Sequence, residues 1–300
     1  MGATRDLLPG FDTIHHEAGD VRIFARKGGS GPPVVLLHGY PQTHVAWHRV
    51  APALAEHFTI VAPDLRGYGR SSCPPTDMFH LPYSKRAMAN DVVGLMARLG
   101  FTRFSVVGHD RGGRVGYRLA LDQPDCVDRL VLVDILSTLD QIQPANESER
   151  QRLQHWALLS QPAPIPESLI GANVSDWVES RLRRGARDRA LQAFDADALA
   201  AYLAALSDPD RVHSTCEDFR AGASCDLRDD REDRHTRRLI TCPTLLVWGT
   251  EGSLSGLPDP RIPWARWCTS LEGQSVEAGH FIPEENPAGL LAAIMPFLTA

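Results

Sequence analysis

A glycine-flanked aspartate is the residue of this 300-residue chain that is best placed for chemistry. Gly108-x-Asp110-x-Gly112 follows a short apolar run and precedes residues 114–121, whose apolar spacing is helical. A sharp turn between a strand and a helix raises its central side chain above a sheet, beside a helix N-terminus. A carboxylate there needs no deprotonation, and it can displace a leaving group from saturated carbon to give an ester. The pattern predicts Asp110 as a nucleophile; the alternative is a tight turn in which Asp110 caps the helix.

Hydrolysis of such an ester requires a base, and a histidine near the end of the chain is placed to be one. His280 stands in the segment AGHF, after the last region of strand character; the alternative is a histidine of a surface loop. An imidazole base needs an acid that fixes its tautomer and stabilises its protonated form. Asp134 ends a buried strand pattern and is the favoured acid. After the next strand pattern, Gly252 takes the place where an acid is usual, and Glu251 is one residue out of register.

Short apolar runs alternate with helical patterns in most of the chain. Strands are predicted at residues 21–26, 34–37, 60–62, 104–107, 130–133 and 244–249, and helices at 87–99, 114–121 and 288–298. Such alternation indicates an α/β protein whose mostly parallel sheet is flanked by helices on both faces. From residue 139 to 229 the strand patterns stop, and the segment is helical, rich in Ala and Arg, and interrupted by Pro. We therefore predict a core of residues 1–138 and 230–300 with an inserted helical cap at 139–229.

Composition narrows the range of partners. With 43% hydrophobic residues and a net charge of −6, the chain has no general basic surface for nucleic acid or anionic membranes. No apolar run approaches the roughly 20 residues that span a bilayer, and no signal peptide is visible, so we expect a cytoplasmic protein. The six cysteines are scattered without metal-ligand spacing, which predicts free thiols and no metal site. An anionic substrate would have to be attracted by a local cluster of cations.

Several long segments are more specific than these general patterns. They read LLHGYPQTHVAWHRVAPALAE, DLRGYGRSS, YSKRAMA, GHDRGGRVGYRLALD, HWALLSQPAP, CEDFRAGA and AGHFIPEE. Over nearly its whole length the sequence resembles the haloacetate dehalogenases of the α/β-hydrolase superfamily, and it is especially similar to those that act on fluoroacetate. The resemblance implies an α/β-hydrolase core with a helical cap, a homodimer and no cofactor. It also implies hydrolysis of fluoro-, chloro- or bromoacetate to glycolate and halide through an alkyl ester on Asp110.

Two arginines close to the nucleophile indicate the charge of the substrate. Arg111 follows Asp110 directly, and Arg114 lies about one helical turn further on. Two guanidinium groups beside a carboxylate nucleophile favour a small anionic haloacid, whose own carboxylate can form bidentate pairs with them. The alternative is that they neutralise Asp110 or pair with acids of the cap. In haloalkane dehalogenases a tryptophan typically follows the nucleophile, whereas the resembling family assigns both arginines to the substrate carboxylate.

The leaving halide needs hydrogen-bond donors held in a dry site. His155 and Trp156 match the halide-binding pair of the resembling family, although a His-Trp pair in an apolar helix is more typical of core packing. The third donor of that family is a tyrosine, and this chain has Phe219 there, so strong defluorination is not expected. Tyr40 lies in a loop that resembles the family's oxyanion loop, whose backbone N–H would act with that of Arg111. His109 is expected to be structural.

Two other functions are weighed against this one. An epoxide hydrolase would use the same Asp-His-Asp constellation, but it needs acids in the cap, normally two tyrosines, to protonate the opening ring. Tyr202 is the one tyrosine of the predicted cap. A non-catalytic receptor on this fold would have lost part of the constellation, whereas Asp110, Asp134 and His280 are all present. Hydrolytic dehalogenation is the favoured prediction, and epoxide hydrolysis is the alternative.

Overall fold

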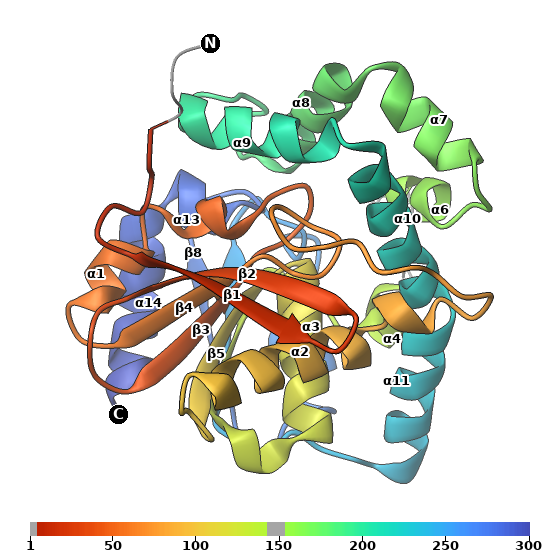
Figure 1. The fold of residues 1–300 in the computed structure, drawn as a ribbon. Helices are drawn as coiled ribbons and strands as arrows, with labels where there is room; N and C mark the ends of the chain where they lie inside the picture. The colour runs from red at the N-terminus through yellow and green to blue at the C-terminus, as the bar shows by residue number, and fades with distance from the viewer. Residues whose placement is uncertain (1–4, 143–153) are drawn as a thin grey trace.

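An eight-stranded sheet forms the centre of the computed structural model, which describes residues 5–142 and 154–300 (Figure 1). The strands are β1 (Asp12–Ala18), β2 (Val21–Gly28), β3 (Pro33–Leu37), β4 (Thr59–Pro63), β5 (Phe104–His109), β6 (Val127–Val133), β7 (Thr244–Gly249) and β8 (Leu271–Val276). Their order in the sheet is β1-β2-β4-β3-β5-β6-β7-β8. β2 pairs antiparallel with β1 and β4, and all other pairs are parallel. The predicted α/β class with a mostly parallel sheet is confirmed.

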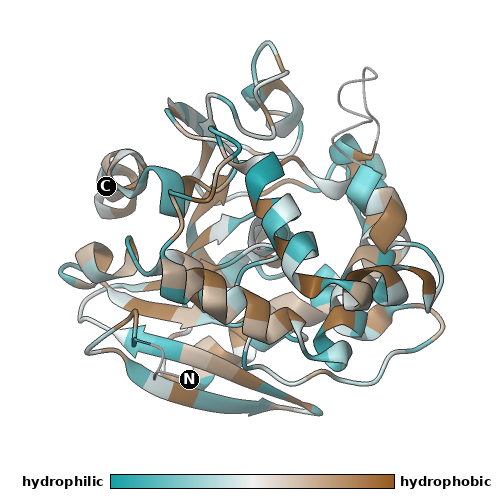
Figure 2. Cartoon of the chain, turned by 90° about the horizontal axis from the view of Figure 1, so that it is seen from above, coloured by the Kyte–Doolittle hydropathy of each residue, from teal (hydrophilic) through white to brown (hydrophobic). Residues whose placement is uncertain are grey.

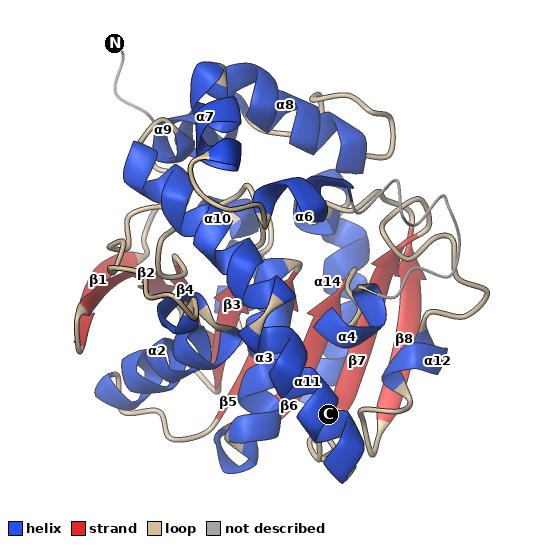
Figure 3. Ribbon diagram, turned by 90° about the vertical axis from the view of Figure 1, so that its right-hand side faces the viewer, coloured by secondary structure: helices blue, strands red, loops and turns tan. Residues whose placement is uncertain are grey.

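Helices cover both faces of the sheet, as the side view shows (Figure 3). One face carries α2 (Lys85–Arg98) and α3 (Arg111–Asp122), and the other carries α1 (Ala51–Ala55) and α14 (Pro287–Thr299). Successive residues of a strand point to opposite faces, so Val35 packs in the first core and Val34 in the second. The central strands are therefore buried on both sides, which is why they are continuous apolar runs in the sequence.

A series of helices lies between β6 and β7 in the chain. They are α4 (Thr138–Gln141), α6 (Gln154–Leu159), α7 (Ile165–Ala172), α8 (Val174–Gly185), α9 (Ala196–Leu206), α10 (Pro209–Ala223) and α11 (Cys225–Thr236). We call α6 to α10 the cap. It lies over the carboxyl ends of the parallel strands (Figure 3), and hydrophilic and hydrophobic residues are interleaved along its helices (Figure 2). The remaining short helices are η1 (His44–Trp47), η2 (Leu81–Tyr83), η3 (Pro124–Cys126), α12 (Arg261–Trp264) and α13 (Ile282–Glu285).

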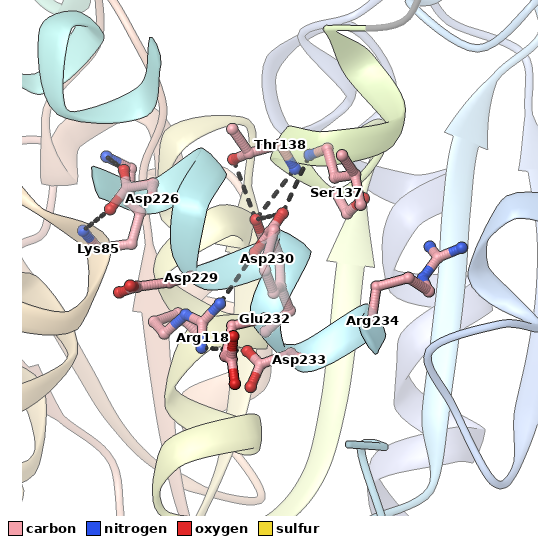
Figure 4. A network of polar contacts seen from close by, with 12 residues as sticks. Lys85, Arg118, Ser137, Thr138, Asp226, Asp229, Asp230, Glu232, Asp233 and Arg234 are labelled. Atoms are coloured by element: carbon pink, nitrogen blue, oxygen red, sulfur yellow. Dashed lines mark hydrogen bonds and ion pairs between the residues drawn. The ribbon is translucent and has the colours of Figure 1, made fainter. Parts of the chain in front are cut away.

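Buried charges hold α11 against the core, so this helix is not part of the cap (Figure 4). Arg118 of α3 binds Asp230 at 2.9 Å and Asp233 at 2.5 Å, and all three side chains are almost fully buried. The hydroxyl of Tyr117 donates to Asp230 at 2.9 Å. The expected cap boundary at residue 229 thus lies inside a helix that packs along α3. Within the described residues, no helix is long and apolar enough to cross a bilayer.

Candidate active site

The turn between β5 and α3 carries Asp110 in a strained backbone conformation. Asp110 has φ +44° and ψ −114°, a region that residues other than glycine rarely adopt. A Cβ at Gly108 would lie 2.6 Å from the carbonyl oxygen of Gly112, and one at Gly112 would lie 2.3 Å from that of Leu37. The two glycines therefore permit close backbone packing around the turn, while the aspartate itself takes the strained dihedral angles.

The loop before η1 lies directly against this aspartate. The backbone N–H of Tyr40 donates to Oδ2 of Asp110 at 2.9 Å. A Cβ at Gly39 would lie 2.6 Å from Cβ of Asp110, so this close approach requires glycine. The Tyr40 N–H is thereby in position to stabilise negative charge on the Asp110 carboxyl group.

Positive groups keep the buried carboxyl group of Asp110 ionised. Burial alone would raise its pKa, but the charges of His280, His109, Arg111 and Arg114 outweigh this effect and lower the pKa to about 2. Asp110 is therefore a carboxylate at neutral pH, the form that attacks saturated carbon.

His280 is held by one acid and one hydroxyl group. Its Nδ1 lies 2.7 Å from Oδ2 of Asp134 and 2.9 Å from the hydroxyl oxygen of Ser253. Burial lowers the pKa of His280, but the hydrogen bond and charge of Asp134 raise it above its usual value. His109 lies behind the ring: its Nε2 is 2.9 Å from the backbone carbonyl oxygen of His280, and burial lowers its own pKa to about 4. Sequence reasoning did not single out Ser253, because the side chain becomes relevant only through its proximity to the ring.

Asp134 contacts the histidine, whereas Glu251 does not contact it. Asp134 also accepts hydrogen bonds from the backbone N–H groups of Gly249, at 3.2 Å, and Ser253, at 2.6 Å. A Cβ at Gly252 would lie 2.5 Å from Oδ1 of Asp134, so the carboxylate occupies space that a side chain there would need. Glu251 instead pairs with Arg187 at 2.6 Å, in an exposed position.

Arg111 is engaged by an acid of the cap. Its Nε and one terminal nitrogen donate to the two carboxylate oxygens of Asp218 at 2.7 and 2.8 Å, and all of these groups are buried. Asp218 also binds the ammonium group of Lys85 and accepts a hydrogen bond from Tyr68 at 2.7 Å. Of the three guanidinium nitrogens of Arg111, Nη1 is the one that is buried without a hydrogen-bond partner among the described residues. Pairing with a cap acid was the alternative considered for the arginines, and for Arg111 the structure shows such a pair.

Arg114 is in a different situation because its contacts are neutral. Its terminal nitrogens lie 3.2 Å from the hydroxyl oxygen of Thr138 and 3.5 Å from the amide oxygen of Gln141. Its Nε is buried without a partner, and the guanidinium group stacks over the ring of Trp156 at 4.5 Å. Burial and the neighbouring charge of Arg111 lower its pKa. In the part of the chain that the structure describes, Arg114 is thus a buried cation without a bound carboxylate.

A cavity of about 750 Å³ brings most of the predicted site residues together. Its wall includes Tyr40, Asp110, Arg114, His155, Trp156 and His280. Phe219 lies behind this wall: its ring centroid is 5.3 Å from that of Trp156 and 6.0 Å from that of His155, and the side chain is fully buried. The predicted halide pair thus faces the cavity, whereas Phe219 supports it from behind.

The cap tyrosine does not contribute to this cavity. Tyr202 is fully buried, and its hydroxyl group donates to Oε1 of Glu284, which also accepts from Nε2 of Gln42 at 2.6 Å. The hydrogen bond between Tyr202 and Glu284 joins α9 of the cap to α13 of the core. Tyr40, from the core, is the tyrosine that lines the cavity within residues 5–142 and 154–300, and its hydroxyl group accepts a hydrogen bond from Nε1 of Trp177.

The fold and the strained aspartate turn define the class of protein. The chain belongs to the α/β-hydrolase fold family, whose model matches residues 32–287. It is 40% identical to a fluoroacetate dehalogenase from Burkholderia sp. over 98% of this chain and 95% of that one. It is also 34% identical to a soluble epoxide hydrolase from Corynebacterium sp. (strain C12) over 95% and 97%. The crystal structure of an α/β-hydrolase protein from Nostoc sp. PCC 7120 superposes with a TM-score of 0.93 at 44% identity, covering 96% and 98%. The protein is thus an α/β-fold hydrolase whose substrate has to be inferred from its site.

Proposed function

We propose that this protein hydrolyses haloacetates, such as fluoroacetate, chloroacetate and bromoacetate, to glycolate and halide. The observation that carries the proposal is Arg114, a buried guanidinium group without a bound carboxylate among the described residues, close to the ionised Asp110. A buried charge without a partner is destabilising by several kcal/mol, on the order of 3 kcal/mol. A substrate carboxylate in the cavity would supply the partner of Arg114, whereas Arg111 does not line the described wall of the cavity and has only its buried Nη1 left for such a contact.

In the first step Asp110 displaces the halide. One carboxylate oxygen forms a bond to the carbon that carries the halogen, and the carbon–halogen bond breaks, with its electron pair leaving on the halide. His155 and Trp156, on the wall of the same cavity, donate hydrogen bonds to the departing ion. The product of this step is a carboxymethyl ester of Asp110.

In the second step water hydrolyses the ester. His280 accepts a proton from water, whose oxygen attacks the carboxyl carbon of Asp110. The Tyr40 N–H stabilises the oxygen that becomes negative, and Asp134 stabilises the protonated imidazole. The acyl–oxygen bond then breaks, so that glycolate leaves and Asp110 is regenerated, with one proton released overall.

Replacing the base tests this sequence of steps. We expect His280→Asn to release about one chloride per active site from chloroacetate and then to stop, because the ester forms but is not hydrolysed. Mass spectrometry should find a carboxymethyl group on the peptide that contains Asp110. In the unaltered enzyme, a single turnover in ¹⁸O-water should label Asp110 and leave glycolate unlabelled. Steady turnover by the variant would remove His280 from its role and overturn the proposed mechanism.

Epoxide hydrolysis is the second candidate. It is favoured by the 34% identity to a soluble epoxide hydrolase and by the position of Tyr40, whose hydroxyl group can donate to an epoxide oxygen in the cavity. Tyr202 cannot be the second acid in this arrangement, because its hydroxyl group is bonded to Glu284. Diol formation from styrene oxide, compared with halide release from chloroacetate at equal enzyme concentration, distinguishes the two reactions.

The proposal includes a homodimer located in the cytoplasm. Both are expectations from the sequence and its resemblance. Sedimentation velocity of the purified chain, across a hundredfold range of concentration, tests the dimer; a single species with the mass of one chain would contradict it.

A further inference from the structure

A second group of arginines lines the cap side of the cavity. Arg181 and Arg184 belong to α8, and Arg187 and Arg189 follow it. Arg187 already has an ion-pair partner, Glu251. Neither Arg181 nor Arg184 has an ion pair with any carboxylate of the described residues, and we call these two the distal arginines. They concentrate positive charge in one cavity of a chain whose net charge is −6.

Arg181 is held in place by its neighbours. Its guanidinium group stacks at 5.1 Å over the ring of Trp177, whose Nε1 donates to the hydroxyl group of Tyr40. The Nε of Arg181 is buried without a hydrogen-bond partner among the described residues. Burial lowers the pKa of Arg181, and the adjacent charge of Arg184 lowers it further. This guanidinium group is therefore fixed, partly desolvated and lacking an acid, as an anion-binding group would be.

The same chain of contacts links Arg181 to the reacting carboxylate. Tyr40 donates its backbone N–H to Asp110 at one end and contacts Trp177 through its hydroxyl group at the other. One tyrosine side chain and one indole ring thus lie along the path of contacts from Asp110 to Arg181. A ligand that contacts both residues has its second charged group on the cap side of the cavity, away from the reacting carbon.

The cavity is also too large for a haloacetate alone. A haloacetate has five non-hydrogen atoms and fills about 100 Å³, roughly three water volumes, whereas the cavity measures about 750 Å³. Gly185, at the end of α8, packs directly against the segment that carries the base: a Cβ there would lie 2.6 Å from the ring of Phe281. Its carbonyl oxygen accepts the backbone N–H of His280 at 2.7 Å, so backbone alone closes this part of the wall.

We propose that the preferred substrates are short 2-halodicarboxylates, whose distal carboxylate binds Arg181 and Arg184 while the reacting end binds Arg114. The inference rests on the proposed function and names its substrate class. The reaction follows the same two steps. Asp110 forms a bond to the carbon carrying the halogen, halide leaves with the electron pair, and water releases a 2-hydroxydicarboxylate, regenerating Asp110 with loss of one proton.

Matched substrates test the proposal. Racemic 2-chlorosuccinate and 2-chlorobutyrate have the same number of carbons, but the first ends in a carboxylate and the second in a methyl group. We expect kcat/KM to favour chlorosuccinate by about tenfold or more, and Arg181→Gln or Arg184→Gln to reduce that preference about tenfold, through KM. Arg183→Gln is the control, because Arg183 is exposed, pairs with Glu179 and does not line the cavity. A preference for chlorobutyrate, or equal losses on both substrates in Arg181→Gln, would overturn the inference.

A binding measurement separates this inference from the proposed reaction. By calorimetry, succinate should bind the unaltered enzyme more tightly than butyrate does, and Arg181→Gln should remove the difference while Arg183→Gln keeps it. If no haloacid releases halide but succinate binding still depends on Arg181, the dehalogenation proposal fails and the dicarboxylate site stands. If chloroacetate is turned over but succinate binds no better than butyrate, the dicarboxylate site fails and dehalogenation stands.

Discussion

The reacting residues and the arginines that face them differ in how completely their hydrogen bonds are satisfied. Asp134 accepts bonds from His280 and from two backbone N–H groups, and Asp110 accepts one from Tyr40. Across the cavity, Arg114 and Arg181 each have a buried Nε without a partner among the described residues. Buried polar groups are nearly always paired in native proteins, and these two arginines line the cavity, where a ligand can supply the missing partner.

This difference suggests separate roles: the reacting residues carry out the chemistry, and the arginines determine which substrate binds. The reacting residues have hydrogen-bond partners within the chain, so the fold holds them whether or not a ligand is present, and their arrangement suits ester formation and hydrolysis. Proteins named for two different reactions are similar to this chain at 40% and 34% identity, so a shared fold does not define the substrate. In our proposal, the incompletely paired arginines select the substrate by its charge and size.

The largest effect is expected from the reacting residues themselves. Asp110→Asn replaces the nucleophile with a neutral amide, so haloacetate turnover should fall by at least about 10⁴-fold and no ester should form. Halide release and intact-protein mass report the two results, and circular dichroism checks that the chain stays folded. Turnover within tenfold of the unaltered enzyme would mean that water attacks the substrate directly.

A smaller and substrate-dependent effect is expected from the arginines. Arg114→Leu removes the cation that we assign to the substrate carboxylate, and kcat/KM for chloroacetate should fall about 100-fold, equivalent to ~3 kcal/mol. Chloroacetamide is neutral and should be affected much less, so it serves as the control in the same preparation. Equal losses on the two substrates would show that Arg114 serves Asp110 or the fold and not recognition.

The free energy of unfolding should depend on pH through Glu284, which joins the core to the cap. Burial raises the pKa of Glu284 to about 7, so the folded protein holds this carboxyl group neutral near pH 6, whereas the unfolded chain ionises it near its ordinary value of 4.5. The folded state then binds more protons, and the free energy of unfolding should fall between pH 4.5 and pH 7, by on the order of 3 kcal/mol. Glu284→Gln should remove that part of the slope in urea unfolding at pH 5 and pH 8.

The matched control is Glu272→Gln, at an exposed position of β8. It should leave the pH dependence as it is in the unaltered protein. An unchanged slope in Glu284→Gln would show that Glu284 is ionised in the folded state and that Gln42 and Tyr202 stabilise its charge.

The sequence predicted the central strands well and the edges poorly. β3 to β7 are buried on both faces, so they are short apolar runs that stand out from their surroundings. β8 (Leu271–Val276) reads LEGQSV and is largely exposed at one edge of the sheet, and β1 at the other edge is similarly exposed. Neither was predicted as a strand, because pairing at an edge requires no apolar alternation.

Among the site residues, local patterns identified Asp110, but they could not show how Arg111 is paired. Its partner Asp218 is 107 positions away in the chain, and a charged residue within a helix is usually a surface residue. Lys85 shares that carboxylate from a third segment. Burial of opposite charges against each other is a property of the tertiary structure, and the only signal in the sequence was that these residues lie in segments shared with the resembling family.

The smallest effect is expected at Phe219, and it concerns the halide. Chloride leaves with little help from hydrogen-bond donors, whereas fluoride requires its developing charge to be held by several. Phe219 packs edge-on against Trp156 and His155, so a hydroxyl group added there would lie close to the pair that we assign to the halide. Phe219→Tyr should raise fluoroacetate turnover over chloroacetate turnover by about tenfold, the value of one good hydrogen bond at ~1.4 kcal/mol. The measurement is the ratio of the two kcat/KM values in one buffer. An unchanged ratio would mean that a residue at 219 acts only by packing against the halide pair.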